Sequence, residues 1–110
     1  MKRRHPDAAE ADDALSELAQ TLRALDSEAD LRAFLEDLCT PAELEAMTDR
    51  WRVVPLLLDG VPYREIHDRT RVSVTTIGRV ARTLERGSGG YAAAAQRRGL
   101  GRAAASGAAP

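Results

Sequence analysis

The chain has 110 residues, which suits one domain with a modest core, and only 4% of them are aromatic. A single cysteine, Cys39, excludes an internal disulfide and favours a reducing compartment. The formal net charge of −1 conceals an asymmetry: residues 1–49 carry five basic and 13 acidic side chains, whereas residues 50–110 carry 11 basic and four acidic ones.

This asymmetry leaves two interpretations open. Either the basic half meets a polyanion, or the acidic and basic helices pair with each other. No apolar run is long enough to cross a bilayer, and the start lacks the apolar stretch of a signal peptide. We therefore expect a soluble, cytoplasmic protein that does not contact a membrane.

The residue pattern predicts an all-α chain. We expect residues 1–10 to be a disordered tail of mixed charges, and residues 99–110 to be a disordered Ala/Gly tail. Residues 11–98 are expected to form one helical domain. Its first helix is predicted over residues 11–25, because four leucines recur there at helical spacing: Leu15, Leu18, Leu22 and Leu25.

Capping signals place the next two helices. Ser27 can cap the second helix, and the segment Thr40–Glu43, "TPAE", has the pattern of a capping box at the start of the third. The third helix is predicted to end at Gly60. Pro55 lies inside it and costs ~3 kcal/mol unless a kink relieves the crowding, so we predict a bend near Trp51–Pro55.

Three shorter helices follow, over residues 63–70, 74–86 and 91–98, with Pro62 and Ser73 at the starts of the first two. A tight turn joins the first two, as in a helix-turn-helix whose second helix protrudes. The apolar residues expected to hold this pair together are Ile66, Val72, Ile77 and Val80.

Two residues depart from the usual helix-turn-helix pattern. His67 stands where a small residue is expected, and it would crowd the helix crossing unless its ring swings outward. Arg71 stands where glycine is common. It must adopt a left-handed conformation at some cost, or else the turn differs slightly.

The segment from Tyr63 to Arg82 carries five arginines around the helix expected to protrude. Such a helix can read base edges and contact phosphates, and Gly78 would allow close approach at a cost of ~1 kcal/mol in helix stability. The alternative is that the arginines only keep a surface soluble. The candidate DNA-binding residues are Arg64, Arg69, Arg71, Ser73, Val74, Thr75, Thr76, Gly78, Arg79 and Arg82.

Enzymatic and metal sites are not predicted. The adjacent carboxylates Asp12–Asp13 and Glu36–Asp37 point in different directions on a helix. Cys39 has no evident histidine partner, and His67 is the only histidine in the segment expected to be ordered, so one chain cannot assemble a metal cluster from His and Cys.

The first three helices each present one apolar stripe and few aromatic residues, which makes a monomer of this size marginal. Exchange of helices with a second copy would enlarge the shared core, so the sequence favours an obligate homodimer.

Read together, "CTPAELEAMTDRWRVVPLLLDG", the paired helices and "IGRVARTLERGSGGY" resemble the tryptophan-repressor superfamily, and more narrowly its homologues of the YerC/YecD type. The resemblance covers about residues 30–92. It implies an intertwined, all-helical homodimer that represses transcription by binding double-stranded DNA at half-sites ~34 Å apart. The rival hypothesis is a protein-interaction module that docks on a transcription partner such as polymerase.

The resemblance also implies a candidate effector pocket. Thr40, Arg50 and Arg79 match the positions that hold the co-repressor in the tryptophan repressor. Val80 replaces a glycine that leaves room for that ligand, and Trp51 could fill the remaining space. Tryptophan or another amino-acid co-repressor is therefore disfavoured, and no cofactor is expected.

Overall fold

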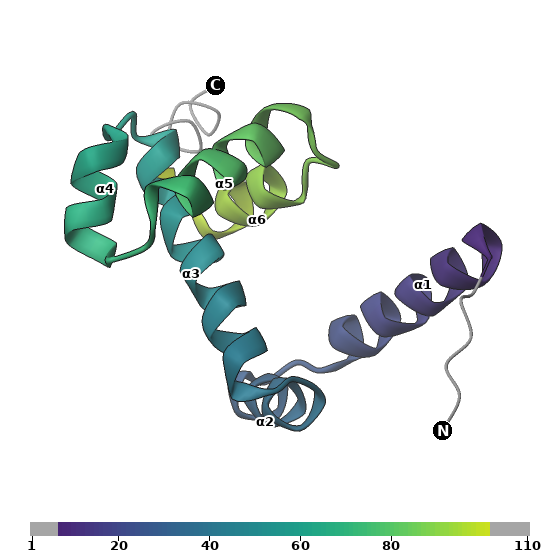
Figure 1. Ribbon diagram of the computed structural model, residues 1–110. Helices are drawn as coiled ribbons and strands as arrows, with labels where there is room; N and C mark the ends of the chain where they lie inside the picture. The colour runs from purple at the N-terminus through teal and green to yellow at the C-terminus, as the bar shows by residue number, and fades with distance from the viewer. Residues whose placement is uncertain (1–6, 102–110) are drawn as a thin grey trace. The chain divides into compact units, whose positions relative to one another are not determined.

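The computed structural model describes residues 7–101, and within that range the chain forms six α-helices and no strands (Figure 1). This confirms the predicted all-α class. No helix within the same range is long and apolar enough to cross a membrane. The helices are α1 (Ala8–Ala24), α2 (Glu28–Leu38), α3 (Pro41–Leu58), α4 (Tyr63–Thr70), α5 (Val74–Arg86) and α6 (Gly90–Arg98).

The chain divides into two compact units between Thr40 and Pro41, so the expected single domain over residues 11–98 stays a prediction. In the first unit, Ser27 caps α2 by accepting a hydrogen bond from the Asp30 amide (3.1 Å). No residue of α1 or α2 is buried, and Leu15 is 65% exposed. The apolar stripes of both helices are therefore only partly covered: Leu15 and Leu38 are exposed, and the other leucines and Phe34 are half-buried.

Helix α1 begins three residues before the predicted start, so the prediction of a disordered tail is wrong for residues 8–10. The carboxylate of Asp7 accepts from the Glu10 amide at 2.8 Å, and the carboxylate of Glu10 accepts from the Asp7 amide at 3.1 Å. This reciprocal capping box satisfies amides that a helix end otherwise leaves unpaired. The predicted disorder of residues 1–6 and 102–110 lies outside the described residues.

In the second unit, α3 packs against α4, α5 and α6, and α4 packs against α5. The core forms where these helices meet the C-terminal half of α3. Its buried members are Val53, Val54, Ile66, Val72, Ile77, Val80 and Ala95. Burying each aliphatic side chain larger than alanine contributes about 1.5–3 kcal/mol, so this small cluster fixes the mutual positions of the four helices.

Glycines end two of these helices as the sequence requires. Gly60 has φ 78°, and the amides of Gly60 and Val61 donate back to the last turn of α3. Gly99 closes α6 in the same way, and Leu100 packs on the core, so the ordered chain continues past residue 98, where the tail was predicted to begin. Helix α3 is continuous through Pro55, and the predicted bend stays a prediction.

Candidate nucleic-acid interface

Helices α4 and α5 and the three residues between them form the pair that the sequence predicted (Figure 1). The four residues expected to hold the pair together are all buried: Ile66, Val72, Ile77 and Val80. Their burial uses one side of α5, since Ile77 and Val80 lie one turn apart. The opposite side of α5 is left at the surface.

Of the two alternatives that the sequence left open for the turn, the structure has the first, with Arg71 in the left-handed conformation. Arg71 has φ 68° and ψ 6°, and among the described residues it is the only non-glycine residue with positive φ. Its amide donates to the His67 carbonyl at 2.7 Å, which ends α4. A left-handed non-glycine residue costs ~1 kcal/mol or more, so the buried contacts on either side must maintain this conformation.

His67 does not crowd the helix crossing, because its ring turns toward the loop. The ring atom Nδ1 lies 2.8 Å from the carbonyl oxygen of Val72, so the proton on Nδ1 is donated to that oxygen. The hydroxyl of Thr70, which is buried, donates to the Ile66 carbonyl at 2.7 Å and accepts from the Val72 amide at 3.1 Å. Both backbone groups of Val72 are thereby satisfied inside the turn.

The start of α5 is organised by two hydroxyls. Ser73 accepts from the Thr76 amide at 3.1 Å and donates to the Thr76 hydroxyl at 3.0 Å. Ser73 is exposed and Thr76 is half-buried. Because Thr76 Oγ1 receives the Ser73 proton, its own proton stays available for an external acceptor.

The remaining candidates on α5 lie at or near its surface. Thr75, Arg79 and Arg82 are exposed, and Val74 is 52% exposed although it is apolar. Gly78 is half-buried beside Tyr63, and a Cβ added there would lie 3.9 Å from the Tyr63 ring, an ordinary contact. The fold itself therefore does not require glycine at this position.

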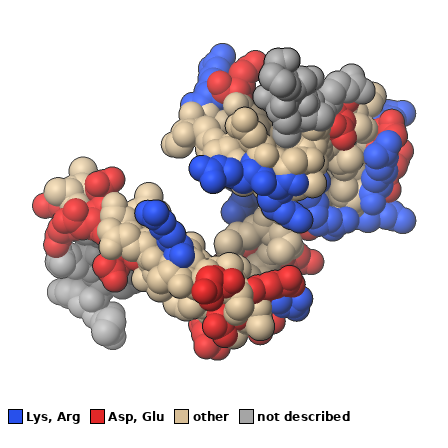
Figure 2. Space-filling model, turned by 180° about the vertical axis from the view of Figure 1, so that it is seen from behind, with Lys and Arg blue, Asp and Glu red and all other residues tan. Residues whose placement is uncertain are grey.

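The arginines differ in how their charge is compensated. Arg69 forms an ion pair with Glu65 one turn earlier on α4. Within residues 7–101, no acidic side chain lies within 4.0 Å of the guanidinium groups of Arg64, Arg71, Arg79 or Arg82. Figure 2 shows basic side chains gathered mainly on the α3–α6 unit and acidic ones mainly on the α1–α2 unit.

The three residues of the candidate effector pocket belong to different parts of the structure. Arg50 is half-buried on α3 and Arg79 is exposed on α5, whereas Thr40 belongs to the other unit. Val80 is buried in the core, and Trp51 packs against that core with its ring 6.5 Å from the ring of Tyr91. In the part of the chain that the structure describes, no cluster of His, Cys, Asp and Glu is arranged to hold a metal ion.

Sequence reasoning missed two residues of this region. The part that Thr70 plays in the turn depends on its burial, which no local pattern reveals. Arg86 lines a surface depression together with Arg79 and Arg82, and only its helical spacing from those two arginines could have indicated this.

Comparison with known proteins places this arrangement in a family. The family model described as Trp repressor protein matches residues 13–98. The chain is 32% identical over 83 residues to a Bacillus subtilis (strain 168) protein named "Uncharacterized protein YerC", and the match covers 76% of this chain and 80% of the relative.

Two solved structures have the same fold. A TrpR like protein from Eubacterium eligens ATCC 27750 aligns with a TM-score of 0.76 and 31% identity, covering 82% of this chain and 93% of the other. A Staphylococcus aureus crystal structure aligns with a TM-score of 0.75 and 30% identity, covering 79% and 87%.

Proposed function

The chain belongs to the Trp repressor family, and from that premise we propose that it is a sequence-specific, DNA-binding transcriptional regulator of the repressor type. The observation that carries the proposal is the two-sided character of α5. Its apolar side is buried against α3 and α4, and its opposite side presents Thr75, Arg79 and Arg82 without acidic partners among the described residues. We propose a role in binding rather than catalysis, in the cytoplasm.

In this proposal the N-terminal half of α5 reads bases in the major groove. Thr75 can hydrogen-bond a base edge, and the exposed methyl groups of Val74 can contact the methyl group of thymine. Arg79 and Arg82 can fork onto guanine or clamp phosphates. Around them, Ser73, Thr76 and Gly78 would lie close to the groove.

In the same proposal, the arginines of α4 and of the turn contact DNA phosphates. Arg64 and Arg71 are exposed and have no acidic partner among the described residues, so each can neutralise a phosphate directly. Arg69 must first give up its pair with Glu65, and its contribution should be smaller. An exposed pair of this kind is worth only 0.2–1 kcal/mol, roughly, so the exchange is feasible.

The active species is proposed to be a homodimer. The apolar stripes of α1 and α2 contain no buried residue, with Leu15 65% and Leu38 52% exposed, so a second copy would cover surface that one chain leaves in water. Two copies would present two α5 helices to half-sites about 34 Å apart. Sedimentation that finds a stable folded monomer at micromolar concentration would contradict this assembly.

The family resemblance also implies an amino-acid effector bound by Thr40, Arg50 and Arg79, and we do not favour this binding. Val80 contributes its side chain to the core, and an enclosed pocket tolerates added bulk poorly. We expect calorimetric titration with tryptophan to give no binding heat. A saturable heat that disappears in Arg50→Ala would reverse this expectation.

The alternative function is a protein-interaction module in which α4 and α5 dock on a transcription partner. Salt dependence separates the two, because DNA binding weakens steeply as counterion release becomes less favourable, whereas a mostly apolar interface weakens little. The exposed apolar residue of α5 that would support docking is Val74.

The test is a mobility-shift selection with genomic fragments, followed by titration of the selected duplex with Arg79→Ala and Arg82→Ala. Each substitution should cost about 1–3 kcal/mol of binding free energy if it breaks a bidentate base contact. Arg97→Ala, on α6, serves as the charge-matched control and should bind like the wild type. Absence of sequence-dependent binding at low salt would favour the interaction module.

A further inference from the structure

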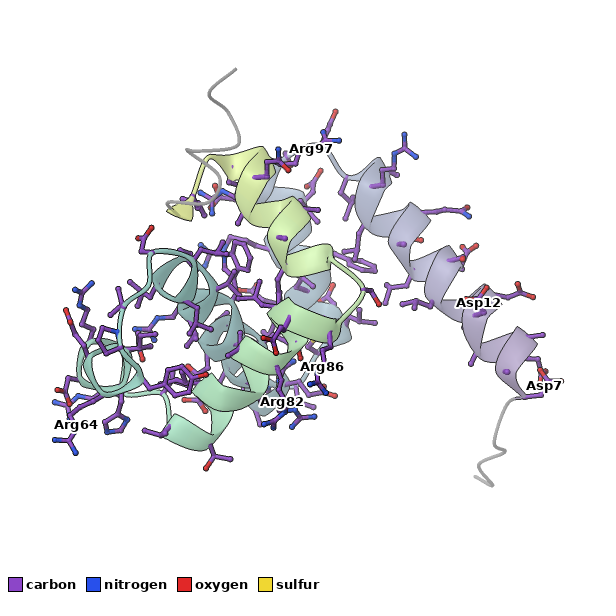
Figure 3. All side chains as sticks on the ribbon, turned by 90° about the horizontal axis from the view of Figure 1, so that it is seen from above. Asp7, Asp12, Arg64, Arg82, Arg86 and Arg97 are labelled. Atoms are coloured by element: carbon purple, nitrogen blue, oxygen red, sulfur yellow. The ribbon has the colours of Figure 1, made fainter. Side chains whose placement is uncertain are left out.

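A shallow depression of about 360 Å³ lies along α5 from its middle to its C-terminal end, and it includes the two arginines of α5 already proposed to contact DNA. It is lined by Arg79, Arg82, Thr83, Arg86 and Gly87. All three arginines are exposed, and no acidic residue within the described range lies within 4.0 Å of their guanidinium groups. Figure 3 shows Arg82 and Arg86 beside each other on α5, away from Arg97 on α6.

Helical geometry gathers these arginines into one row. At 3.6 residues per turn, Arg79, Arg82 and Arg86 lie within about 60° of one another around the axis of α5. The one acidic residue of the helix, Glu85, lies about 100° from Arg86 and about 60° from Arg82, and it lines a different, more apolar groove that Arg82 also borders. No acidic residue of α5 therefore lies between the three arginines, and Glu85 stands to one side of the row.

The length of α5 determines what this row meets on DNA. Its 13 residues span about 20 Å, and Arg86 lies about 16 Å along the axis from Thr75. The major groove is only about 12 Å wide, and the N-terminal residues of such a helix contact the bases. The C-terminal half of α5 must therefore leave the groove floor beside the sugar–phosphate wall.

The guanidinium groups are the groups of this depression that can bind a phosphate. The negative pole of the helix dipole opposes an anion at this end of α5. The Gly87 amide is already donated to the Thr83 carbonyl at 2.7 Å, and the Thr83 hydroxyl to the Arg79 carbonyl at 3.0 Å. Binding then depends on the three arginines, whose planar forks match phosphate oxygens.

We infer that Arg79, Arg82 and Arg86 form a phosphate-binding cradle that holds the DNA backbone flanking the bases read by α5. The inference rests on the proposed DNA-binding function and adds Arg86 to it. Arg86 fixes the register of α5 in the groove and carries no sequence information itself, because every nucleotide offers the same phosphate.

The test compares Arg86→Gln and Arg86→Lys with the wild type by fluorescence anisotropy from about 50 to 200 mM salt, on the selected duplex and on a scrambled one. The slope of log K against log salt is negative, and Arg86→Gln should reduce its magnitude by about 1 on both duplexes. Arg86→Lys should keep the wild-type slope, because lysine still neutralises one phosphate. Arg97→Gln removes the same charge from the last turn of α6 and should also leave the slope unchanged.

The outcomes distinguish this inference from the proposed function. Wild-type binding with an unchanged slope in Arg86→Gln would overturn the cradle and leave the proposed function intact. No DNA binding by the wild type at low salt would overturn both. If Arg86→Gln keeps the slope while inorganic phosphate shifts the NMR signals of the arginine side chains, the occupant is a free anion and the DNA assignment is wrong.

Discussion

Gly78→Ala should separate folding from DNA binding at one position. Gly78 lies inside α5 with a φ outside the positive range, and an added methyl group would meet only the Tyr63 ring at 3.9 Å. Alanine is more favourable than glycine in a helix interior by about 1 kcal/mol. The variant should therefore be more stable, with a Tm roughly 4–8 °C higher, as expected for a domain of this size.

The same methyl group should weaken DNA binding. If the backbone at residue 78 approaches the groove wall closely, the methyl group displaces α5 outward and lengthens the hydrogen bonds from Arg79 and Arg82. Loss of one bidentate contact costs about 1–3 kcal/mol, which is about 5- to 150-fold in affinity. Stability gained and affinity lost in one variant is an outcome that general damage to the fold cannot produce.

The assays are thermal unfolding by circular dichroism and anisotropy titration of the selected duplex. Gly90→Ala is the matched control, because a Cβ there has no neighbour within 4 Å, its φ is not positive and the residue lies at the start of α6. It should leave the affinity unchanged. A lower Tm for Gly78→Ala would contradict the claim that the fold has room for a methyl group at residue 78. An unchanged affinity would contradict the close approach of α5 to DNA.

Substitutions at three further positions test the packing of α4 against α5. Arg71→Gly should raise the free energy of unfolding by ~1 kcal/mol in urea titration, because glycine adopts φ 68° without strain; no gain would show that the turn is not strained. Thr70→Val leaves the buried amide of Val72 without its acceptor and should cost about 1–3 kcal/mol, whereas Thr70→Ser should cost less. Ile77→Ala creates a cavity in the core and should cost about 2–5 kcal/mol, and a smaller loss would mean that α5 is loosely held.

The sequence was most informative where the structure is local. Ser73 as a cap and the proline and glycine signals placed α4 and α5 at the residues where the structure has them. The start of α1 is also local, because Asp7 and Glu10 have capping-box spacing, although the composition of residues 1–10 favours a tail. The ion pair between Arg69 and Glu65 likewise follows from their spacing of four.

Only the tertiary structure decided where His67 and Thr70 point, and which arginines share a surface. The sequence allowed the ring of His67 either to swing outward or to crowd the helix crossing. In the structure the ring turns toward the carbonyl of Val72, across the turn, and is hydrogen-bonded to it. Arg86 joins Arg79 and Arg82 because the opposite side of α5 is buried against α3 and α4. Caps and turns depend on groups a few residues apart, which the sequence lists in order, whereas burial depends on partners brought together by the whole fold.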